Sequence, residues 1–252
     1  MCIRDSKAAA GSMNILITGA SSGIGKRLAI DYLKAGHVVN CCGRDIPALN
    51  QIKERFPNQA IILNFDVCSL DSCAESFTSL KPLDLVILNA GTCEYIDARS
   101  FDAALYSRVM RVNVEGTANC LQFLIPQIKE GGSLALMGSS SSFLPLPKAE
   151  AYGASKAAIY YLAQTLRISL KPAKICVSYI APGFVETPLT DRNDFPMPMR
   201  VDVNYASAQI QKGLEKGNWL IHFPKNFTWL LKAIGVLPAR LQQFLIAKTL
   251  AY

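Results

Sequence analysis

The sequence predicts a single α/β domain built on a doubly wound, mostly parallel sheet of seven strands with helices on both faces. Short apolar runs alternate along the chain with stretches of helical periodicity, and each spacer is long enough for a helix. The runs are apolar on both faces, which is typical of strands buried between two layers of helices. They lie at residues 14–18, 37–42, 60–65, 83–88, 133–137, 174–180 and 219–223.

The length of the chain fits one such domain. It has 252 residues, half of them apolar, and no linker rich in Pro, Gly or Ser divides it. We expect a domain of the Rossmann type over residues 13–224. Residues 1–12 lack the apolar stretch of a secretory signal, and we interpret them as an appended leader outside the fold. Residues 225–252 are interpreted as a helical tail that is apolar and basic.

The composition excludes several classes of function. The net charge is +7, but Lys and Arg are scattered and form no block, which does not favour a nucleic-acid partner. The absence of any run of 18 apolar residues argues against a transmembrane helix. Eight cysteines without CxxC spacing indicate reduced thiols and a cytoplasmic location. Because His37 and His222 are far apart, we expect no metal site and no Ser-His-Asp triad.

A glycine-rich turn, "TGASSGIG" at residues 18–25, joins the first expected strand to an amphipathic helix. Its three glycines let the chain turn sharply, so that a helix N-terminus can approach a bound anion. Backbone N–H groups and the helix dipole would then hold a pyrophosphate, which indicates nucleotide binding. The alternative is an ordinary βα loop. The candidate contacts are Gly19, Ser21, Ser22, Gly23, Ile24 and Gly25.

The end of the second expected strand, at Gly43, Arg44 and Asp45, would lie near the adenosine ribose. An arginine at this place accommodates a 2′-phosphate, whereas a carboxylate accepts hydrogen bonds from both ribose hydroxyls. Arg44 offers a planar fork suited to phosphate. Asp45 is a rival reader of the ribose, although it could equally cap the following helix. The sequence therefore favours NADP(H) over NAD(H), and a solvated loop charge is the remaining interpretation of Arg44.

Tyr152 and Lys156 lie four residues apart in an alanine-rich helical stretch, "AYGASKAAIY". Residues at this spacing are neighbours on one helix face, so the Lys156 ammonium would stabilise the Tyr152 phenolate and lower the pKa of that hydroxyl. A phenol with a lowered pKa can donate or accept a proton at neutral pH. The alternative is a half-buried tyrosine beside a solvated lysine.

Several further motifs, taken with these, resemble the short-chain dehydrogenase/reductase family in its order. They are "LNAG" at 88–91, "NVEG" at 113–116, "GSSSS" at 138–142, "YGASK" at 152–156 and "PGFVETPL" at 182–189. The resemblance covers about residues 13–222, and Leu88 departs from the family's usual asparagine. It implies a Rossmann fold, an NAD(P) cofactor and an oxidoreductase acting on a carbonyl or alcohol.

The resemblance also implies roles for individual residues. The catalytic set would be Asn113, Ser139, Tyr152 and Lys156, with Ser139 preferred within a run of four serines and Asn113 in a proton relay to Lys156. Asn113 could instead be a helix-interior amide paired with backbone. Tyr152 and Lys156 would also contact the cofactor. The other implied cofactor contacts are Asp66, Val67, Asn89, Ala90, Gly91, Pro182, Gly183, Val185 and Thr187.

The substrate side and the tail are less defined. Apolar and sulfur-containing residues suggest a neutral or apolar small-molecule substrate. The candidate substrate contacts are Ser141, Phe143, Phe195, Met197 and Met199. The tail could pack on the domain or on a second subunit, which we favour, or lie on an anionic membrane surface. A homo-oligomer, a dimer or tetramer, is expected through the helices that begin near residues 102 and 152.

Three functions remain open on the sequence. The preferred one is transfer of a hydride between NADP(H) and a carbonyl or alcohol. The second is a silent nucleotide-binding sensor or scaffold, which would not need Asn113, Ser139, Tyr152 and Lys156. The third is a membrane-surface module led by the tail.

Overall fold

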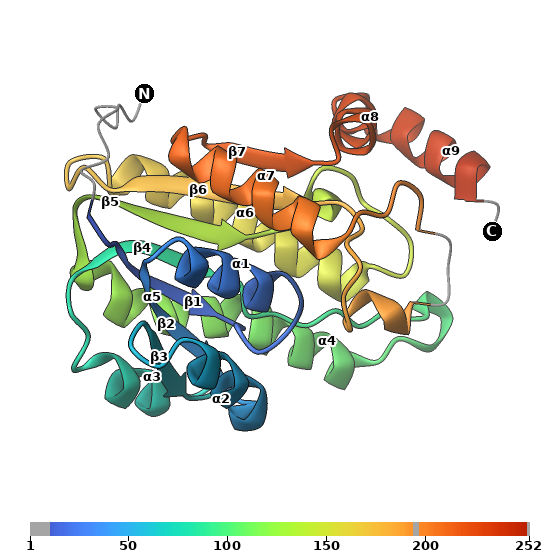
Figure 1. Cartoon of the computed structure of the whole chain (residues 1–252). Coiled ribbons are helices and arrows are strands. Elements are labelled where there is room, and N and C mark those ends of the chain that lie inside the picture. Colours follow the sequence, from blue (N-terminus) through green and yellow to red (C-terminus); the bar gives the residue numbers. More distant parts are fainter. Residues whose placement is uncertain (1–10, 194–196, 251–252) are drawn as a thin grey trace.

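The computed structural model of the chain describes residues 11–193 and 197–250, and a seven-stranded sheet forms its centre (Figure 1). All strands run parallel, in the order β3-β2-β1-β4-β5-β6-β7. The predicted doubly wound α/β fold is confirmed. The strands are β1 (Asn14–Thr18), β2 (Val38–Gly43), β3 (Ala60–Asn64), β4 (Leu83–Leu88), β5 (Ile128–Met137), β6 (Cys176–Pro182) and β7 (Leu220–Phe223).

Each predicted apolar run lies largely within one strand, and the largest difference is at β5. This strand begins at Ile128, whereas the apolar run begins at Ser133. Between them stand polar residues at the amino end of the sheet, where Lys129 Nζ lies 2.8 Å from Asp84 Oδ1. Strand pairing there depends on backbone hydrogen bonds rather than on apolar burial, so the hydropathy pattern does not mark it.

Helices cover both faces of the sheet (Figure 1). On one face, α1, α2 and α7 pack around Ile15 and Ile17, and on the other face α3, α5 and α6 pack around Leu16. This alternation follows from the period of two along β1. Near α6 lies α4 (Ala103–Met110). The covering helices are α1 (Gly23–Lys34), α2 (Ile46–Arg55), α3 (Leu70–Phe77), α5 (Gly116–Leu124), α6 (Glu150–Ser169) and α7 (Val203–Glu215).

Four helix starts are encoded locally by a capping side chain, whereas the start of α1 is not, which bears on function. The carboxylates of Asp45, Asp102 and Asp202 and the hydroxyl of Ser69 each accept a hydrogen bond from a backbone N–H of the first turn. At α1 the N-cap residue is Ser22, and its side chain makes no such bond. The first N–H groups of α1 therefore stay available to a ligand.

The carboxyl ends of the strands form the edge at which the site is built. The strand order reverses between β1 and β4, so the loops that follow these two strands leave toward opposite faces. Such a switch point opens a crevice in doubly wound sheets. We therefore expect a ligand site at the ends of β1 and β4.

Two further helices, α8 (Lys225–Gly235) and α9 (Ala239–Leu250), follow β7. They lie beyond the carboxyl end of that strand, and α9 extends away from the sheet (Figure 1). Phe227 and Leu231 of α8 are buried against Leu144. Within the described residues, no helix is both long and apolar enough to cross a membrane.

Candidate active site

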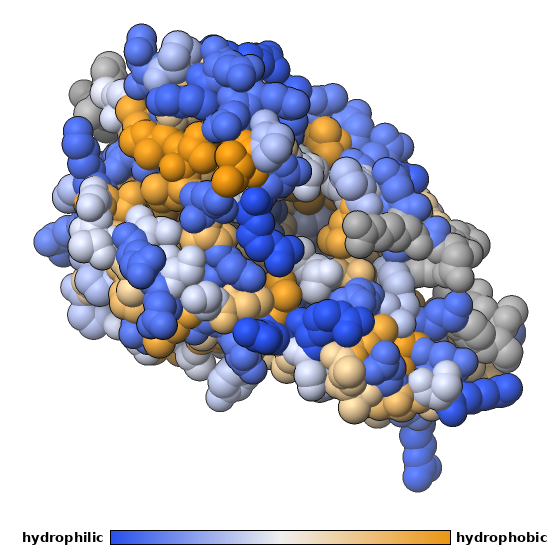
Figure 2. Space-filling model, turned by 90° about the horizontal axis from the view of Figure 1, so that it is seen from below, coloured by the Kyte–Doolittle hydropathy of each residue, from blue (hydrophilic) through white to orange (hydrophobic). Residues whose placement is uncertain are grey.

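A cavity of about 590 Å³ lies at the carboxyl ends of the strands. Figure 2 shows a hollow in the face of the molecule seen from below, with strongly hydrophilic side chains along its rim. Residues from several separate stretches of the chain, which follow six of the strands or belong to α1 and α6, line the cavity. They include Gly19, Ser21, Ser22, Gly23, Ile24, Arg44, Asp66, Val67, Asn89, Ala90, Gly91, Ser139, Tyr152, Lys156, Pro182, Gly183, Val185 and Thr187.

The glycine-rich turn forms one wall of this cavity. Gly19 and Gly23 have φ angles of 67° and 52°, in the left-handed region that favours glycine. Gly25 does not line the cavity but lies behind it, where a Cβ atom would stand 2.2 Å from the carbonyl oxygen of Gly19. The turn can follow this path only with glycine at position 25. Together with the uncapped start of α1, it forms a backbone cradle suited to a pyrophosphate.

Asn89 fixes the glycine turn to the end of β4. Its Nδ2 donates to the carbonyl oxygens of Thr18 and Gly19, at 3.0 and 3.2 Å. In return, the Thr18 hydroxyl accepts hydrogen bonds from the backbone N–H groups of Asn89 and Ala90, at 2.9 and 3.0 Å. The segment 89–91 is thus a fixed floor for the cavity, and Thr18 is a supporting residue that the motifs did not single out.

At the end of β2, Asp45 is not free to bind the ribose hydroxyls of a cofactor. Asp45 Oδ1 accepts a hydrogen bond from Ala48 N at 3.0 Å, so this carboxylate caps α2. Arg44 is largely exposed, and its guanidinium lies 3.8 Å from Asp66 Oδ2. Arg44 therefore stands at the cavity edge with only a long, solvent-screened ion pair to Asp66.

Tyr152, Ser139 and Lys156 meet on the floor of the cavity, where the first turns of α6 approach the end of β5. The Ser139 hydroxyl is hydrogen-bonded to the Tyr152 hydroxyl. Lys156 Nζ lies 5.5 Å from the centroid of the Tyr152 ring and donates to the carbonyl oxygen of Met137 at 3.1 Å. Of the four serines, Ser139 is thus the one in contact with Tyr152.

The electrostatics of this pair differ from the expectation. Desolvation raises the pKa of Tyr152 above its ordinary value, Cys93 adds to the rise, and the Ser139 hydrogen bond opposes it. Desolvation also lowers the pKa of Lys156 to about 8. The predicted lowering of the Tyr152 pKa by Lys156 is therefore wrong for this structure. Desolvation disfavours the phenolate and the ammonium more than the attraction between these two charges favours them.

Asn113 lies one layer behind the floor, on a π-helical turn (Arg111–Glu115) between α4 and α5. Its Oδ1 accepts from Thr92 N at 2.8 Å, and its Nδ2 donates to Thr92 O and to Ser155 Oγ, each at 2.9 Å. The amide is thus paired with backbone, as the alternative interpretation foresaw. Single π-helical turns often occur at functional sites. The role of Asn113 in a relay to Lys156 stays a prediction.

Tyr179 is a supporting residue that sequence reasoning missed. This fully buried tyrosine of β6 accepts a hydrogen bond from Ser139 N at 3.2 Å and donates to Ser142 Oγ at 2.9 Å. A Cβ atom on Gly138 would stand 1.9 Å from its ring, so glycine is required there. The only signal in the sequence is that a buried tyrosine needs a partner for its hydroxyl.

Cys93 and Tyr95 also lie near the catalytic floor without having been predicted. The two side chains are hydrogen-bonded to each other, and the Tyr95 hydroxyl also bonds Asn193. Burial raises the pKa of the Cys93 thiol to about 11, which keeps it neutral beside Tyr152 and Lys156. These two residues connect the floor to the loop that follows β6.

None of the predicted substrate contacts is among the residues that line the cavity in the described part of the chain. Phe195 lies outside the described residues, and the other four are not among the residues that line the cavity. Phe143 packs edge-to-face on Tyr160, and Met199 is half exposed. The Ser141 hydroxyl is buried and has no hydrogen-bond partner within the described part of the chain. That orphaned group keeps a substrate contact for Ser141 a reasonable prediction.

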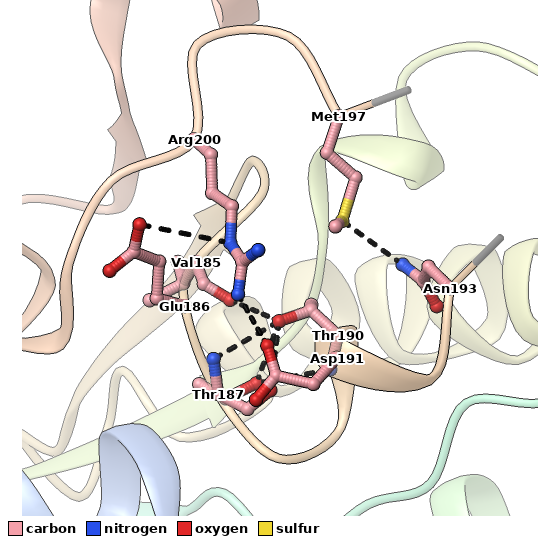
Figure 3. Close-up of polar contacts among 8 residues, drawn as sticks. All are labelled: Val185, Glu186, Thr187, Thr190, Asp191, Asn193, Met197 and Arg200. Atoms are coloured by element: carbon pink, nitrogen blue, oxygen red, sulfur yellow. Dashed lines mark hydrogen bonds and ion pairs between the residues drawn. The ribbon is translucent and has the colours of Figure 1, made fainter. Parts of the chain in front are cut away.

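A loop after β6 lines the cavity beside the glycine turn, where a Cβ atom on Gly23 would stand 3.1 Å from Thr187 Cγ2, and we call residues 185–193 and 197–200 the cover. Figure 3 shows Arg200 between two carboxylates, with its guanidinium 2.5 Å from Asp191 Oδ1 and 4.0 Å from Glu186 Oε1. Thr190 Oγ1 donates to Val185 O at 2.6 Å, and Asn193 Nδ2 donates to Met197 Sδ at 3.3 Å. Side-chain contacts therefore hold the cover together.

Comparison with known proteins shows the family to which this chain belongs. The family described as short chain dehydrogenase matches residues 13–195. A relative from Myxococcus xanthus, described as an uncharacterized oxidoreductase, is 32% identical over 88% of this chain and 92% of its own length. The 11-beta-hydroxysteroid dehydrogenase-like 3 of Arabidopsis thaliana is 30% identical over 89% of this chain and 77% of its own.

Among solved structures, a short chain dehydrogenase from Burkholderia cenocepacia in complex with NADP superposes with a TM-score of 0.83. It is 24% identical, and the match covers 95% of this chain and 98% of the other. At that identity the likeness supports the fold.

Proposed function

The chain belongs to the short-chain dehydrogenase/reductase family of NAD(P)-dependent oxidoreductases, and on that premise we propose that it transfers a hydride between NADP(H) and a neutral or apolar carbonyl or alcohol. The observation that carries this proposal is the meeting of Ser139, Tyr152 and Lys156 on the floor of a cavity whose opposite wall is an anion cradle. A nucleotide sensor would need the anion cradle but not the meeting of these three side chains.

The residues present fit a dinucleotide. The left-handed glycines at 19 and 23, the tight packing at Gly25 and the uncapped start of α1 leave backbone N–H groups for a pyrophosphate. Asp66 and Val67 would flank the adenine, and Pro182, Gly183, Val185 and Thr187 would hold the nicotinamide end. When bound, the nicotinamide supplies or accepts the hydride.

The chain's own residues would supply the proton and orient the substrate. The Tyr152 hydroxyl donates a proton to the carbonyl oxygen in reduction and takes one from the alcohol in oxidation. The Ser139 hydroxyl donates a hydrogen bond to the same oxygen as negative charge grows there. Lys156, held by Met137 O, places a positive charge beside the ring of Tyr152. Asn113 keeps the Thr92 segment and Ser155 in place behind that lysine.

Tyr152→Phe tests the assigned acid. The ring and its packing stay while the only group able to exchange the proton is removed, so we expect kcat to fall by about 10³-fold or more. Cofactor affinity, measured by fluorescence titration, should stay within a few-fold. Near-normal turnover of this variant would overturn the assignment.

We propose NADP(H) as the preferred cofactor because Asp45 is committed to its helix cap while Arg44 is exposed at the cavity edge. Arg44→Ala should weaken NADPH by about tenfold or more and NADH by little, since a charged hydrogen bond to the 2′-phosphate contributes about 1.5–3 kcal/mol. Dissociation constants of both cofactors decide the matter. Equal losses for both would remove Arg44 as the phosphate reader.

For the substrate we propose an apolar ketone or alcohol. Support comes from the Arabidopsis thaliana relative, whose name refers to a hydroxysteroid, and from the bidentate pairing of Arg108 with Glu94 on the cavity wall, which leaves no free arginine there for a substrate carboxylate among the described residues other than Arg44. A screen of NADPH-dependent reduction with ketones of increasing size, against keto acids, tests this. Preference for keto acids would contradict it.

Location and assembly also stay proposals. We propose a cytoplasmic enzyme, consistent with the seven unpaired cysteines of the described residues. We also propose a homo-oligomer through α4 and α6, because Tyr161 and Ile168 of α6 are 71% and 75% exposed. Light scattering of Tyr161→Ser and Ile168→Ser variants would show whether that helix is an interface.

A further inference from the structure

The first tail helix, α8, has two distinct faces. Phe227, Thr228 and Leu231 are buried and face the domain. Trp229 and Leu230 lie on the opposite face and are 58% and 53% exposed. One face of α8 therefore packs on the domain, which is one of the two arrangements expected for the tail. The other face of the helix is left exposed.

The second tail helix, α9, repeats the pattern. Arg240, Leu241, Phe244 and Lys248 are exposed at helical spacing, and Leu241 and Phe244 are 44% and 61% exposed. Val236, in the turn between the helices, is 84% exposed. Exposed apolar side chains of this size within one segment mark an interaction site rather than ordinary surface. We call the tail surface the set Lys225, Trp229, Leu230, Val236, Arg240, Leu241, Phe244 and Lys248.

The charge of this segment has a single sign. Residues 225–252 contain four Lys or Arg and no Asp or Glu, so they supply four of the seven net positive charges of the chain. Lys225, Arg240 and Lys248 form no ion pair with any carboxylate of residues 11–193 and 197–250. Lys232 Nζ lies 4.5 Å from the centroid of the Trp229 ring. Cations and exposed aromatic groups thus occur together on the two tail helices.

We propose that the tail surface binds an anionic phospholipid surface. Helices that lie in the lipid interface combine Trp, Phe and Leu with Lys and Arg, and bind through buried apolar area and attraction to anionic headgroups. Both helices are too short to span a bilayer, so the contact is peripheral. Because the inner face of α8 packs on Leu144 beside the catalytic segment, lipid contact would lie one helix away from the site of an apolar substrate.

A second copy of the chain is the competing occupant, and charge argues against it. A twofold interface places the same patch of each subunit against itself. Here it would bring basic side chains together without a carboxylate from residues 216–252 to pair them. An anionic lipid surface complements the same charges.

Vesicle sedimentation of the full chain provides the first test. The chain should sediment with vesicles that contain phosphatidylserine, should not with phosphatidylcholine alone, and should be released by salt. Arg240→Gln with Lys248→Gln should weaken partitioning about 30-fold, since each basic residue contributes about 1 kcal/mol at an anionic surface. The matched control is Lys34→Gln with Lys171→Gln, which has the same net charge. Both lysines stand at the carboxyl ends of their helices, near the amino ends of the strands and away from the tail.

Tryptophan fluorescence locates the contact. The chain has two tryptophans, of which Trp219 packs on Tyr160 and Tyr179 while Trp229 is exposed. Adding phosphatidylserine vesicles to Trp219→Phe should shift the remaining emission to the blue and protect it from iodide. Trp229→Phe should show neither change, which also serves as the control for any effect of vesicles on the fold.

Three outcomes would overturn the proposal. The first is no binding to phosphatidylserine vesicles at low salt. The second is an equal loss in the Lys34 and Lys171 control, which would assign binding to overall charge. The third is a stable dimer by light scattering that Trp229→Ser with Phe244→Ser converts to monomer, together with unshifted Trp229 emission, which would give the tail surface to a second copy.

Discussion

The two walls of the cavity are held in place by different means. The glycine wall, residues 19–25 and 89–91, is fixed by backbone contacts that leave no room for a side chain and by the hydrogen-bonded amide of Asn89. The cover is fixed by side chains that are partly exposed, with Arg200 between Glu186 and Asp191. A wall that tolerates one residue type leaves a motif in the sequence, whereas a wall of exchangeable contacts does not.

The same difference predicts how each wall responds to mutation. A substitution in the glycine wall must move backbone, so it should affect stability and cofactor binding together. A substitution of Glu186, Asp191 or Arg200 in the cover breaks exposed polar contacts, so it should affect substrate binding more than stability. The catalytic floor lies between these cases, because its groups are polar and Ser139 and Lys156 are buried.

Among the changes that compare the two walls, the largest effect is expected for Gly25→Ala. The added methyl would stand 2.2 Å from Gly19 O and 2.5 Å from Asn89 Nδ2, which forces the turn apart. Overpacking of this kind costs up to about 3 kcal/mol, and we expect cofactor affinity to fall about 100-fold because the N–H cradle loses its shape. Thermal unfolding and cofactor titration measure the two effects.

Gly153→Ala is the matched control for stability. It also adds a methyl group to a helical glycine, but the nearest atom would be Ala149 Cβ at 3.6 Å, an ordinary contact. Alanine stabilises a helix relative to glycine by about 0.5–1 kcal/mol, so the melting temperature should rise slightly. If Gly25→Ala melts like this control and binds cofactor normally, the glycine wall is not the rigid element described above.

A smaller effect is expected from pH, through Lys156 on the catalytic floor. Desolvation lowers the pKa of this ammonium to about 8, from an ordinary value of 10.5. As pH rises through about 8 the charge beside Tyr152 is lost, so kcat/KM for carbonyl reduction should fall up to about tenfold per pH unit. A rate that stays flat up to pH 10 would show that the charge of Lys156 is not needed.

The same group makes a stability prediction of defined sign. The unfolded chain keeps this proton up to the ordinary pKa of 10.5, whereas the folded chain releases it near a pKa of 8. The penalty for the buried charge is therefore present below pH 8 and is relieved between pH 8 and 10.5, where the free energy of unfolding gains a positive slope. Denaturant titrations of wild type and Lys156→Met should differ in that window, and parallel curves would contradict the buried ammonium.

Much of the fold and of the glycine wall could be predicted, and the reasons are physical. Doubly buried strands must be apolar, and a turn that a Cβ atom would block must carry glycine, so both leave a pattern. The role of Tyr179 leaves no motif in the sequence. Its hydroxyl bonds Ser139 and Ser142, which lie far from it in the chain and meet it only in the folded structure. The π-helical turn at Asn113 was also missed, since periodicity does not distinguish it from an α-helix.

The prediction of a lowered Tyr152 pKa was wrong for a related reason. Helical spacing correctly predicts that Lys156 is near, but it cannot report how far both groups are removed from water. In the structure desolvation comes first among the causes for both groups, ahead of every charged neighbour. Where α6 meets β5, burial decides the direction of the shift.

The smallest effect is expected for Arg200→Gln in the cover. Exposed ion pairs contribute about 0–1 kcal/mol, so the melting temperature and kcat should barely change. The loss of the link between Glu186 and Asp191 frees the loop to open, and KM for the substrate should rise about fivefold. Arg200→Lys should rescue only part of this, because an ammonium cannot bridge both carboxylates as the guanidinium fork does. Lys174→Gln, which breaks an exposed pair with Glu130 far from the cavity, should leave KM unchanged. A parallel drop in kcat and melting temperature for Arg200→Gln would show that the cover is as rigid as the glycine wall.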